Sequence, residues 1–315
     1  MKSLITGVEG FVGRHLARHL VSLGREVWGT SERTRLVADW QADLKIATHR
    51  CDVTNASDVE TVMGLVQPDE IYHLAGISHV PASWDEPERV LRTNLLGTLH
   101  VLDAARAAVP KARVLIVSSG DVYGPVMEDR APTEDAPAFP ATPYAVSKLA
   151  ADLLGMTYHL RHGQHVVRMR PYSHTGPGQQ PPFVFPSIAR RIARAEAGLE
   201  EARLPVGNLQ IRRDVTDVRD VVRAYVLALT KGEAGACFNV GRGETLLLQD
   251  AVNVLVQRAR VKITVEVDPA LVRPEEPRAT HCDASRLRRC TGWEPEIPFE
   301  KTLADLLDYW RERRD

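Results

Sequence analysis

Three glycines near the start of the chain restrict its fold more than any other feature. The apolar segment 3–6 is followed directly by Gly7, Gly10 and Gly13, which open an amphipathic segment. This spacing is typical of a tight strand-to-helix turn, because glycine lets the backbone approach a bound group closely. The free N–H groups at the start of such a helix attract phosphate. The sequence therefore predicts a strand, a turn and a helix that together bind a pyrophosphate.

Short apolar segments alternate with amphipathic segments over the first 170 residues. Strands are expected over residues 3–6, 26–30, 47–50, 70–74, 113–118 and 166–170. Helices are expected over residues 11–23, 56–66, 94–108 and 143–161. This alternation predicts an α/β protein with a doubly wound parallel sheet, the Rossmann fold.

The pattern changes after about residue 170, where Pro and Gly cluster in RPYSHTGPGQQPPFVFP before a basic helix expected over residues 187–198. We assign residues 1–170 to the Rossmann domain and expect the segment 214–240 to continue its sheet. Residues 171–213 and 241–315 are expected to form a smaller C-terminal α/β lobe that binds the substrate.

The charges of the chain balance almost completely. The 315 residues include 40 basic and 41 acidic side chains, which gives a formal net charge of −1. We therefore expect neither nucleic acid nor a membrane surface as a partner. An anionic ligand has to be bound by local arginines.

The sequence does not indicate a metal centre, a disulfide framework or a targeting segment. Cys51, Cys237, Cys282 and Cys290 include no C-x-x-C pair, so we expect free thiols and no metal. The segment MKSLITG is typical of a strand rather than a signal peptide, and no apolar run is long enough to span a bilayer. We expect a cytoplasmic protein.

The end of the second expected strand indicates which nicotinamide cofactor binds. Enzymes that use NAD(H) usually have Asp or Glu there for the ribose hydroxyls, whereas this chain has Ser31. Arg33 and Arg35 follow, and they can pair with a 2′-phosphate unless they are solvated loop residues. We expect NADP(H), with NAD(H) as the alternative. The expected cofactor-binding residues are Gly7, Gly10, Phe11, Val12, Gly13, Ser31, Arg33, Asp52, Val53, Leu74, Ala75, Gly76, Asn94, Tyr144, Lys148 and Pro171.

Three polar residues form the expected catalytic set. Tyr144 and Lys148 lie four residues apart in PYAVSK, which puts both side chains on one face of a helix. An ammonium beside a phenol is expected to lower its pKa, so that Tyr144 exchanges a proton with a carbinol oxygen. Ser119 is expected to hydrogen-bond the same oxygen. The set indicates hydride and proton transfer at a carbinol carbon.

Motifs along nearly the whole chain resemble one enzyme family. GxxGxxG, CDV, HLAG, SSGDVYG, PYxxxK and RPYSHTGPGQ are together similar to the extended short-chain dehydrogenase/reductases that act on nucleotide sugars. Within that family, PASWDEP, NLLGTLHVLDA and GEAGACFNVG resemble bacterial reductases that form GDP-D-rhamnose. The resemblance implies a GDP-sugar substrate, GDP-4-keto-6-deoxy-D-mannose, whose C4 ketone receives a hydride from NAD(P)H and a proton from Tyr144.

The related GDP-mannose 4,6-dehydratases are the main competing hypothesis. Sugar-nucleotide dehydratases resemble one another in having Thr, an acid or hydroxyl residue, and Glu where this chain has Ser119, Gly120 and Asp121. The middle group is absent here and the carboxylate is one methylene shorter. We therefore expect ketone reduction rather than elimination, with Asp121 as a further catalytic residue. The sequence also leaves open a 4-epimerase that retains its cofactor, and an inactive Rossmann scaffold or NADP sensor.

The resemblance also implies where the nucleotide sugar binds. Arg213 and Arg273 are the expected diphosphate ligands, and Glu276 is expected to accept the ribose hydroxyls. The full set of expected substrate contacts is Ser78, His79, Ser119, Asp121, Tyr144, Ser173, Arg191, Arg213, Arg273 and Glu276. Ser173 and Tyr172 stand where the family pattern has Asn and Phe, which leaves the sugar specificity open. The resemblance further implies a homodimer, in which the helices expected over residues 94–108 and 143–161 form a four-helix interface.

Overall fold

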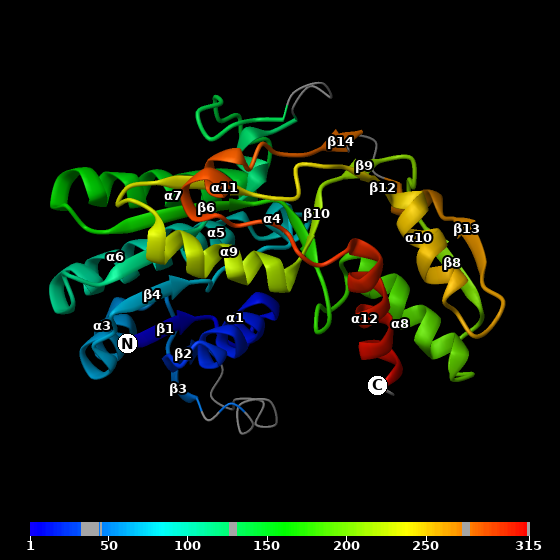
Figure 1. Ribbon diagram of the computed structural model, residues 1–315, viewed down its shortest axis with the longest axis horizontal. Coiled ribbons are helices and arrows are strands. Elements are labelled where there is room, and N and C mark those ends of the chain that lie inside the picture. Colours follow the sequence, from blue (N-terminus) through cyan, green and yellow to red (C-terminus); the bar gives the residue numbers. More distant parts are fainter. Residues whose placement is uncertain (33–43, 45, 126–130, 273–277, 314–315) are drawn as a thin grey trace.

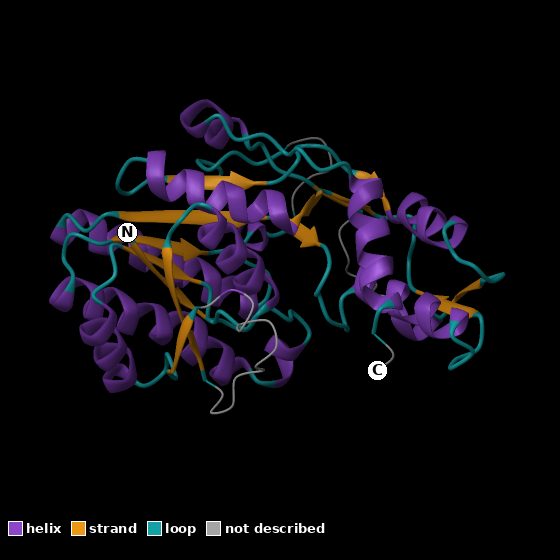
Figure 2. Cartoon of the chain, turned by 60° about the horizontal axis from the view of Figure 1, so that its bottom comes forward, coloured by secondary structure: helices purple, strands orange, loops and turns teal. Residues whose placement is uncertain are grey.

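The chain forms two lobes of unequal size. The computed structural model describes residues 1–32, 44, 46–125, 131–272 and 278–313. Figure 1 shows a larger lobe that contains the N-terminus beside a smaller lobe that contains the C-terminus. In Figure 2, helices lie on both sides of the strands of the larger lobe.

The central sheet of the larger lobe is parallel throughout and has the strand order β11-β6-β5-β4-β1-β2-β3. Its strands are β1 (Lys2–Thr6), β2 (Glu26–Ser31), β3 (Ala47–Arg50), β4 (Glu70–His73), β5 (Arg113–Val117), β6 (Val166–Pro171) and β11 (Cys237–Val240). The predicted Rossmann fold is confirmed, and the six predicted strands agree with β1 to β6 to within one residue at each end. The strand order reverses between β1 and β4, and in such sheets ligands bind outside the carboxyl ends of the strands at this point.

Both faces of the sheet bury apolar side chains. Leu4 and Ile71 belong to one core, whereas their neighbours Ile5 and Tyr72 belong to the other. Successive side chains of a strand point to opposite faces, so both faces need a cover of helices. The helices that supply it are α3 (Ala56–Val66), α6 (Gly97–Ala108) and α7 (Pro143–His162) on one face, and α1 (Phe11–Ser22), α9 (Val218–Lys231) and α11 (Ser285–Thr291) on the other. Each fully buried Leu or Ile contributes roughly 1.5–3 kcal/mol.

The helix predicted over residues 94–108 is interrupted near its start. Arg92–Leu96 form a π-helical turn, η1, and α6 begins only at Gly97. Asn94 lies at the centre of the π turn with 2% of its surface exposed. Turns of this kind are often found at functional sites. The other short elements nearby are α4 (Ala82–Asp85), α5 (Pro87–Leu91) and the 3₁₀ helix η2 (Gly120–Tyr123).

The smaller lobe has its own hydrophobic core, which includes Phe185, Ile192 and Leu303. Its elements are α8 (Val184–Glu196), β8 (Arg203–Val206), β9 (Arg212–Arg213), β12 (Leu246–Leu247), α10 (Leu248–Gln257), β13 (Thr264–Val267), η3 (Pro269–Leu271), β14 (Ala279–Thr280) and α12 (Phe299–Arg311). Helix α8 begins three residues before the predicted start, because a proline such as Pro186 is tolerated in the first turn of a helix.

The segment 214–240 continues the sheet only in part, which corrects the prediction. Strand β11 lies in the central sheet, but β10 (Val215–Asp217) pairs with β7 (Ser173–Thr175) in a separate two-stranded sheet. The chain leaves the central sheet after β6. Strand β10 therefore pairs with β7, outside that sheet, and not with β6.

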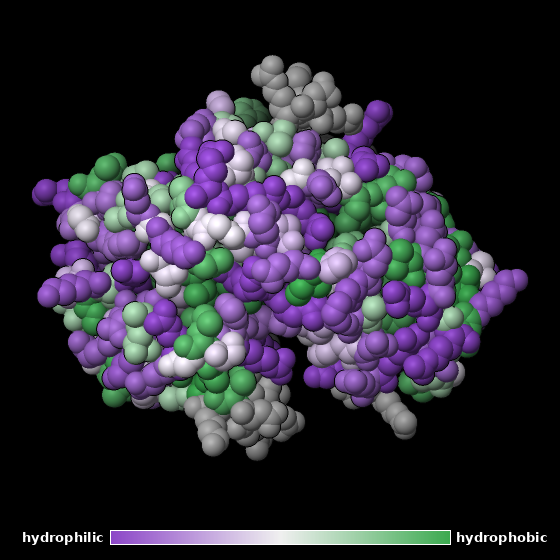
Figure 3. Space-filling view, viewed as in Figure 1, coloured by the Kyte–Doolittle hydropathy of each residue, from purple (hydrophilic) through white to green (hydrophobic). Residues whose placement is uncertain are grey.

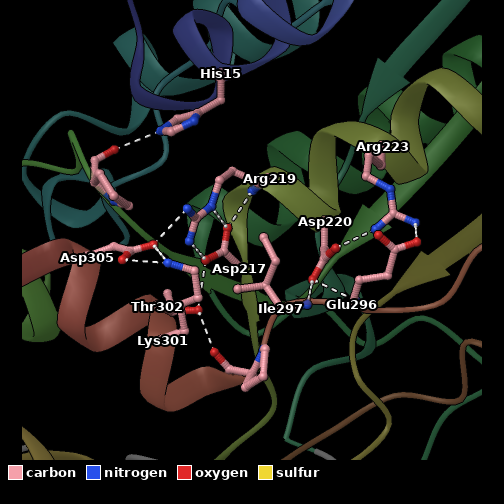
Figure 4. A network of polar contacts seen from close by, with 12 residues as sticks. His15, Asp217, Arg219, Asp220, Arg223, Glu296, Ile297, Lys301, Thr302 and Asp305 are labelled. Atoms are coloured by element: carbon pink, nitrogen blue, oxygen red, sulfur yellow. Dashed lines mark hydrogen bonds and ion pairs between the residues drawn. The ribbon is translucent and has the colours of Figure 1, made fainter.

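A buried carboxylate joins the two lobes. Asp217 caps the N-terminus of α9 and accepts hydrogen bonds from Arg219 and from the hydroxyl of Thr302 on α12 (Figure 4). Arg219 also pairs with Asp305 on α12 at 2.8 Å. On the other side, the ring of His15 on α1 hydrogen-bonds the carbonyl oxygen of Pro177 at 2.7 Å. The contacts of Asp217 and Arg219 fix α12 of the smaller lobe against the start of α9.

The face of the molecule seen in Figure 3 is mostly hydrophilic, and a notch separates the two lobes at its lower edge. Within the described ranges, no helix combines the length and the apolar character needed to cross a bilayer.

Candidate active site

The glycine loop lies where β1 and β4 end side by side. Gly7 has a φ of +70°, and a Cβ there would lie 2.9 Å from the backbone of Ala75. A Cβ on Gly13 would lie 2.6 Å from the carbonyl oxygen of Gly7. Only glycine fits at these two positions, because a side chain would clash with backbone atoms. The turn is therefore held close to the end of the sheet.

The first turn of α1 is suited to an anionic group. Gly10 is the N-cap residue without a side-chain cap, and the first turn contains no acidic residue. The N–H groups and the dipole at this end of a helix favour negative charge, such as a pyrophosphate. Phe11 and Val12 begin the turn, and the ring of Phe11 stacks on His174 with 6.2 Å between centroids. The predicted pyrophosphate site is thus compatible with the structure.

The end of β2 carries a contact that the motifs did not predict. The hydroxyl of Ser31 donates to the carboxylate of Glu9 at 2.9 Å. Glu9 belongs to the glycine loop, so a carboxylate does lie at the strand end where this fold binds the adenosine ribose. Such a group accepts ribose hydroxyls and repels a 2′-phosphate. Arg33 and Arg35, the predicted phosphate ligands, lie outside the described residues.

Asp52 and Val53 follow β3. One carboxylate oxygen of Asp52 accepts hydrogen bonds from the N–H and the hydroxyl of Thr54 at 2.9 and 2.8 Å. These bonds hold the carboxylate at the end of β3, where a contact with the cofactor was predicted. Val53 is buried and packs against Gly97, so a contact of Val53 with a cofactor has to come from its backbone.

The loop after β4 lies between the glycine loop and Lys148. Leu74 and Ala75 each donate a backbone N–H to Thr6, at 3.3 and 3.1 Å. A Cβ on the next residue, Gly76, would lie 3.4 Å from Nζ of Lys148. Of the three predicted cofactor contacts on this loop, Gly76 thus lies beside the ammonium of Lys148, and Leu74 and Ala75 lie beside Thr6.

Asn94 connects this loop with α7. Its amide nitrogen donates to the carbonyl oxygen of Ile77 at 3.0 Å and to the hydroxyl of Ser147 at 2.9 Å. Its amide oxygen accepts the N–H of Ile77 at 2.8 Å. Both donors of the amide are therefore used within the protein, and Asn94 positions the loop beside the cofactor.

The three predicted catalytic residues are brought together at the end of β5. Ser119 follows the strand and caps η2, where its hydroxyl accepts the N–H of Asp121 at 3.1 Å. The same hydroxyl lies near enough to the phenol of Tyr144 to lower the pKa of that phenol. Lys148, one turn further along α7, donates to the carbonyl oxygen of Val117 at 2.9 Å. Tyr144 has only 7% of its surface exposed.

The surroundings of Tyr144 raise the pKa of its phenol, and the predicted lowering by Lys148 is wrong. Burial is the main cause, the carboxylate of Asp121 adds to it, and the hydrogen bond with Ser119 acts in the opposite direction. The ammonium of Lys148 is directed to the carbonyl of Val117 instead, and burial lowers the pKa of Lys148 to about 8. Tyr144 therefore keeps its proton at neutral pH, which suits an acid that protonates a ketone oxygen.

The charge of Arg213 influences the carboxyl of Asp121, although the two residues belong to different lobes. Asp121 is accessible to solvent, yet the surrounding protein raises the pKa of its carboxyl through desolvation, while the charge of Arg213 lowers it. Arg213 belongs to β9 in the smaller lobe. The loop after β5 and strand β9 of the smaller lobe are therefore close enough for the charges of Asp121 and Arg213 to interact.

The other predicted substrate residues differ in how the structure places them. The ring of His79 meets that of Phe183, at the start of α8, edge to face with 6.2 Å between centroids. Ser78 and Ser173 are exposed, and Arg191 is exposed on α8, where no contact within the described ranges joins it to the catalytic residues. Arg273 and Glu276 lie outside the described residues. Pro171 is buried at the end of β6, opposite Val240.

All four cysteines are free thiols, and only Cys290 is exposed. Among the residues that the structure describes, no group of three His, Cys, Asp or Glu side chains could hold a metal ion.

Comparisons with known proteins agree with this arrangement. The model of a protein family described as GDP-mannose 4,6 dehydratase matches residues 4–306. The chain belongs to the GDP-mannose 4,6 dehydratase family. One relative, GDP-6-deoxy-D-mannose reductase of Pseudomonas aeruginosa, is 38% identical over 310 residues, which cover 98% of this chain and 97% of the relative. The resemblance to nucleotide-sugar reductases is thereby confirmed.

Two further comparisons give the similarity of the chain to a dehydratase and to a solved structure. A GDP-mannose 4,6-dehydratase of Vibrio cholerae is 28% identical over 345 residues, which cover 97% of this chain and 92% of the relative. The solved structure of RMD from Pseudomonas aeruginosa complexed with NADPH has a TM-score of 0.87 at 37% identity and covers 99% of both chains.

Sequence reasoning overlooked one residue that organises the site of this family member. Asp214, within the motif RRD, is completely buried and accepts the N–H groups of Arg242 and Gly243 at 2.8 and 2.9 Å. Its carboxylate therefore anchors the segment that carries Arg213. No local signal in the sequence indicated this role, because the two N–H groups lie 28 and 29 residues further along the chain.

Proposed function

We propose that the protein is an NADPH-dependent reductase that converts the C4 ketone of GDP-4-keto-6-deoxy-D-mannose to the alcohol of GDP-D-rhamnose. The observation that carries the proposal is the placement of Ser119, Tyr144 and Lys148 together at the end of β5 in the parallel sheet. When bound, the nicotinamide cofactor supplies a hydride. Tyr144 donates a proton to the ketone oxygen, and the hydroxyl of Ser119 stabilises the charge that develops there.

The composition of the loop after β5 favours reduction over dehydration. Ser119 and Asp121 are the two functional side chains of this loop, and Gly120 between them has none. Elimination of water from a sugar needs an additional acid or base near C5 and C6, which ketone reduction does not require. The reductase of Pseudomonas aeruginosa is also more similar to this chain, at 38% identity, than the Vibrio cholerae dehydratase at 28%.

NADP(H) is the cofactor we propose, with NAD(H) as the second choice. The glycine loop and the first turn of α1 would hold the pyrophosphate, and Lys148 beside Gly76 would bind the nicotinamide ribose. The absence of an acidic residue at the end of β2 itself supports NADP(H). The similar RMD structure contains NADPH. Arg213 would bind the diphosphate of the GDP-sugar.

A direct assay tests this function. Purified protein is incubated with NADPH and either GDP-4-keto-6-deoxy-D-mannose or GDP-mannose. We expect NADPH to be consumed only with the ketone, and GDP-D-rhamnose to form. Conversion of GDP-mannose to the keto sugar without added NADPH would instead establish a dehydratase. A protein that is purified with tightly held NAD(H) would indicate an epimerase.

We further propose that two copies of the chain form a homodimer in the cytoplasm. Val146, Leu153 and Leu160 are spaced by seven residues on α7 and are 44%, 53% and 75% exposed. Large apolar side chains in one row on a helix are typical of an interface. An exposed thiol such as Cys290 suits a reducing compartment. Light scattering is expected to give the mass of a dimer, and Leu153→Glu the mass of a monomer; a monomeric unmodified protein would contradict the proposal.

A further inference from the structure

Gly120 has a neighbour that leaves no room for a side chain. A Cβ built on Gly120 would lie 2.5 Å from Cε2, 2.7 Å from Cδ2 and 2.8 Å from Cζ of Tyr172. Real Cβ atoms do not approach a ring this closely, so the aromatic ring fills the space into which a side chain at position 120 would extend. Even alanine requires the ring to move.

The backbone of Gly120 does not itself require glycine. Gly120 is the first residue of η2, directly after its N-cap residue Ser119. It is not among the glycines with positive φ, in contrast to Gly124 at the other end of the same turn, which has a φ of +69°. Any amino acid can therefore adopt this conformation. The ring of Tyr172, rather than the backbone conformation, is therefore what requires glycine at position 120.

The ring of Tyr172 is held in place from several sides. Its backbone N–H donates to Val240 at 2.8 Å, and its carbonyl oxygen accepts the ring of His174 at 3.0 Å. Its hydroxyl is buried and has no hydrogen-bond partner among the described residues. Burial raises the pKa of this hydroxyl. The ring packs against the hydrophobic core that contains Phe238 and Val240, and this packing holds it in place.

We infer that Tyr172 is a specificity-determining residue, whose ring occupies the place of the middle group of a dehydration set and so favours ketone reduction over elimination. The inference rests on the proposed function. Gly120 and Tyr172 form a sterically coupled pair, in which a side chain at one position requires a smaller residue at the other. The loss of the middle group is therefore enforced by the fold, and restoring it at position 120 alone cannot succeed.

Four variants test the coupling: Gly120→Ser, Tyr172→Ala, and the double variants G120S/Y172A and G120S/Y172F. The two double variants are a matched pair, because Phe keeps the ring and Ala removes it. For each protein we would measure kcat and KM for the keto sugar, the affinity for NADPH by fluorescence, and the melting temperature. We expect Gly120→Ser to lower kcat/KM at least tenfold while the affinity for NADPH stays within about twofold. G120S/Y172A should be at least tenfold more active than G120S/Y172F.

Each outcome supports or refutes the steric coupling of Gly120 and Tyr172. Full activity and an unchanged melting temperature of Gly120→Ser overturn the inference, as do equal defects in the two double variants. If Gly120→Ser is insoluble, a soluble G120S/Y172A beside an insoluble G120S/Y172F supports the coupling, and two insoluble double variants refute it. If the unmodified protein does not reduce the ketone, the proposed function fails; the melting temperatures and NADPH affinities still test the steric pair.

Discussion

The carboxylate of Asp121 raises the pKa of the Tyr144 phenol, although the two residues belong to different elements, η2 and α7. A negative charge nearby disfavours the phenolate, and burial acts in the same direction. Together they keep the proton on Tyr144 until a stronger acceptor, such as the oxygen of a ketone that receives a hydride, takes it. If Tyr144 is the proton donor of the proposed reduction, Asp121 acts by keeping the proton on its phenol.

Replacement of Asp121 by Asn is expected to lower the pKa of Tyr144. Since the proposed reduction needs protonated Tyr144, its rate falls as pH rises through that pKa. In Asp121→Asn this fall should begin at a lower pH. The measurement is kcat/KM for ketone reduction against pH. Asp250→Asn, at an exposed site on α10, is the control. A fall at the same pH in Asp121→Asn and in the unmodified protein would refute the electrostatic role.

Tyr144→Phe removes the proton donor and leaves the ring. We expect kcat to fall by about 10²- to 10⁴-fold, the range typical of general acid catalysis, with little change in NADPH binding. Tyr158→Phe is the matched control on the same helix, because its hydroxyl donates only to Asp103 at 2.8 Å. Stopped-flow kinetics and cofactor titration separate the two effects. Equal losses in both variants would contradict a specific role of Tyr144.

Glu9 is expected to influence the choice between NADPH and NADH. Its carboxylate lies beside Ser31 at the end of β2, where it opposes the charge of a 2′-phosphate. Glu9→Gln removes this charge and keeps the size of the side chain. The ratio of the dissociation constants for NADH and NADPH should rise about three- to tenfold, measured by calorimetry with each cofactor. Glu60→Gln, on the exposed side of α3, provides the control. An unchanged ratio would show that Glu9 lies away from the phosphate.

The sheet could be predicted from the sequence because its strands are buried on both faces. Segments such as VLIV in β5 are continuously apolar, and the residues that interrupt them mark the strand ends. Short-range spacing also predicted the positions of Gly7 and Gly13 in the first turn, and of Tyr144 and Lys148 on one helix, because the residues of each pair lie close together in the sequence. Such local patterns can be recognised in the sequence without knowledge of tertiary contacts.

The remaining features depend on contacts between distant segments. Spacing put Lys148 on the same helix face as Tyr144, but only the fold directs its ammonium to Val117. The contact of Gly120 with Tyr172 joins residues 52 positions apart in the sequence. The π turn at Asn94 depends on tertiary hydrogen bonds to Ile77 and Ser147, which leave no periodic signal.

Asp152 on α7 is expected to be essential for stability. Its carboxylate accepts hydrogen bonds from Arg168 at 2.7 Å and from Arg170 at 2.8 Å, and these ion pairs attach α7 to β6. All three side chains are almost completely buried. Asp152→Asn would leave two buried guanidinium groups without a counter-charge, and we expect a loss of about 3–5 kcal/mol in the free energy of unfolding. Urea denaturation measures this loss.

Asp103→Asn on the neighbouring helix α6 is the matched control. Asp103 and Arg106 are both about half exposed and lie 3.5 Å apart, and such surface pairs contribute about 0–1 kcal/mol. Because α7 also carries Tyr144 and Lys148, the Asp152 variant should lose activity at a lower urea concentration than the control, in step with its unfolding. Similar stabilities of the two variants would show that the buried pairs are dispensable, and that packing alone holds α7 and its catalytic residues on the sheet.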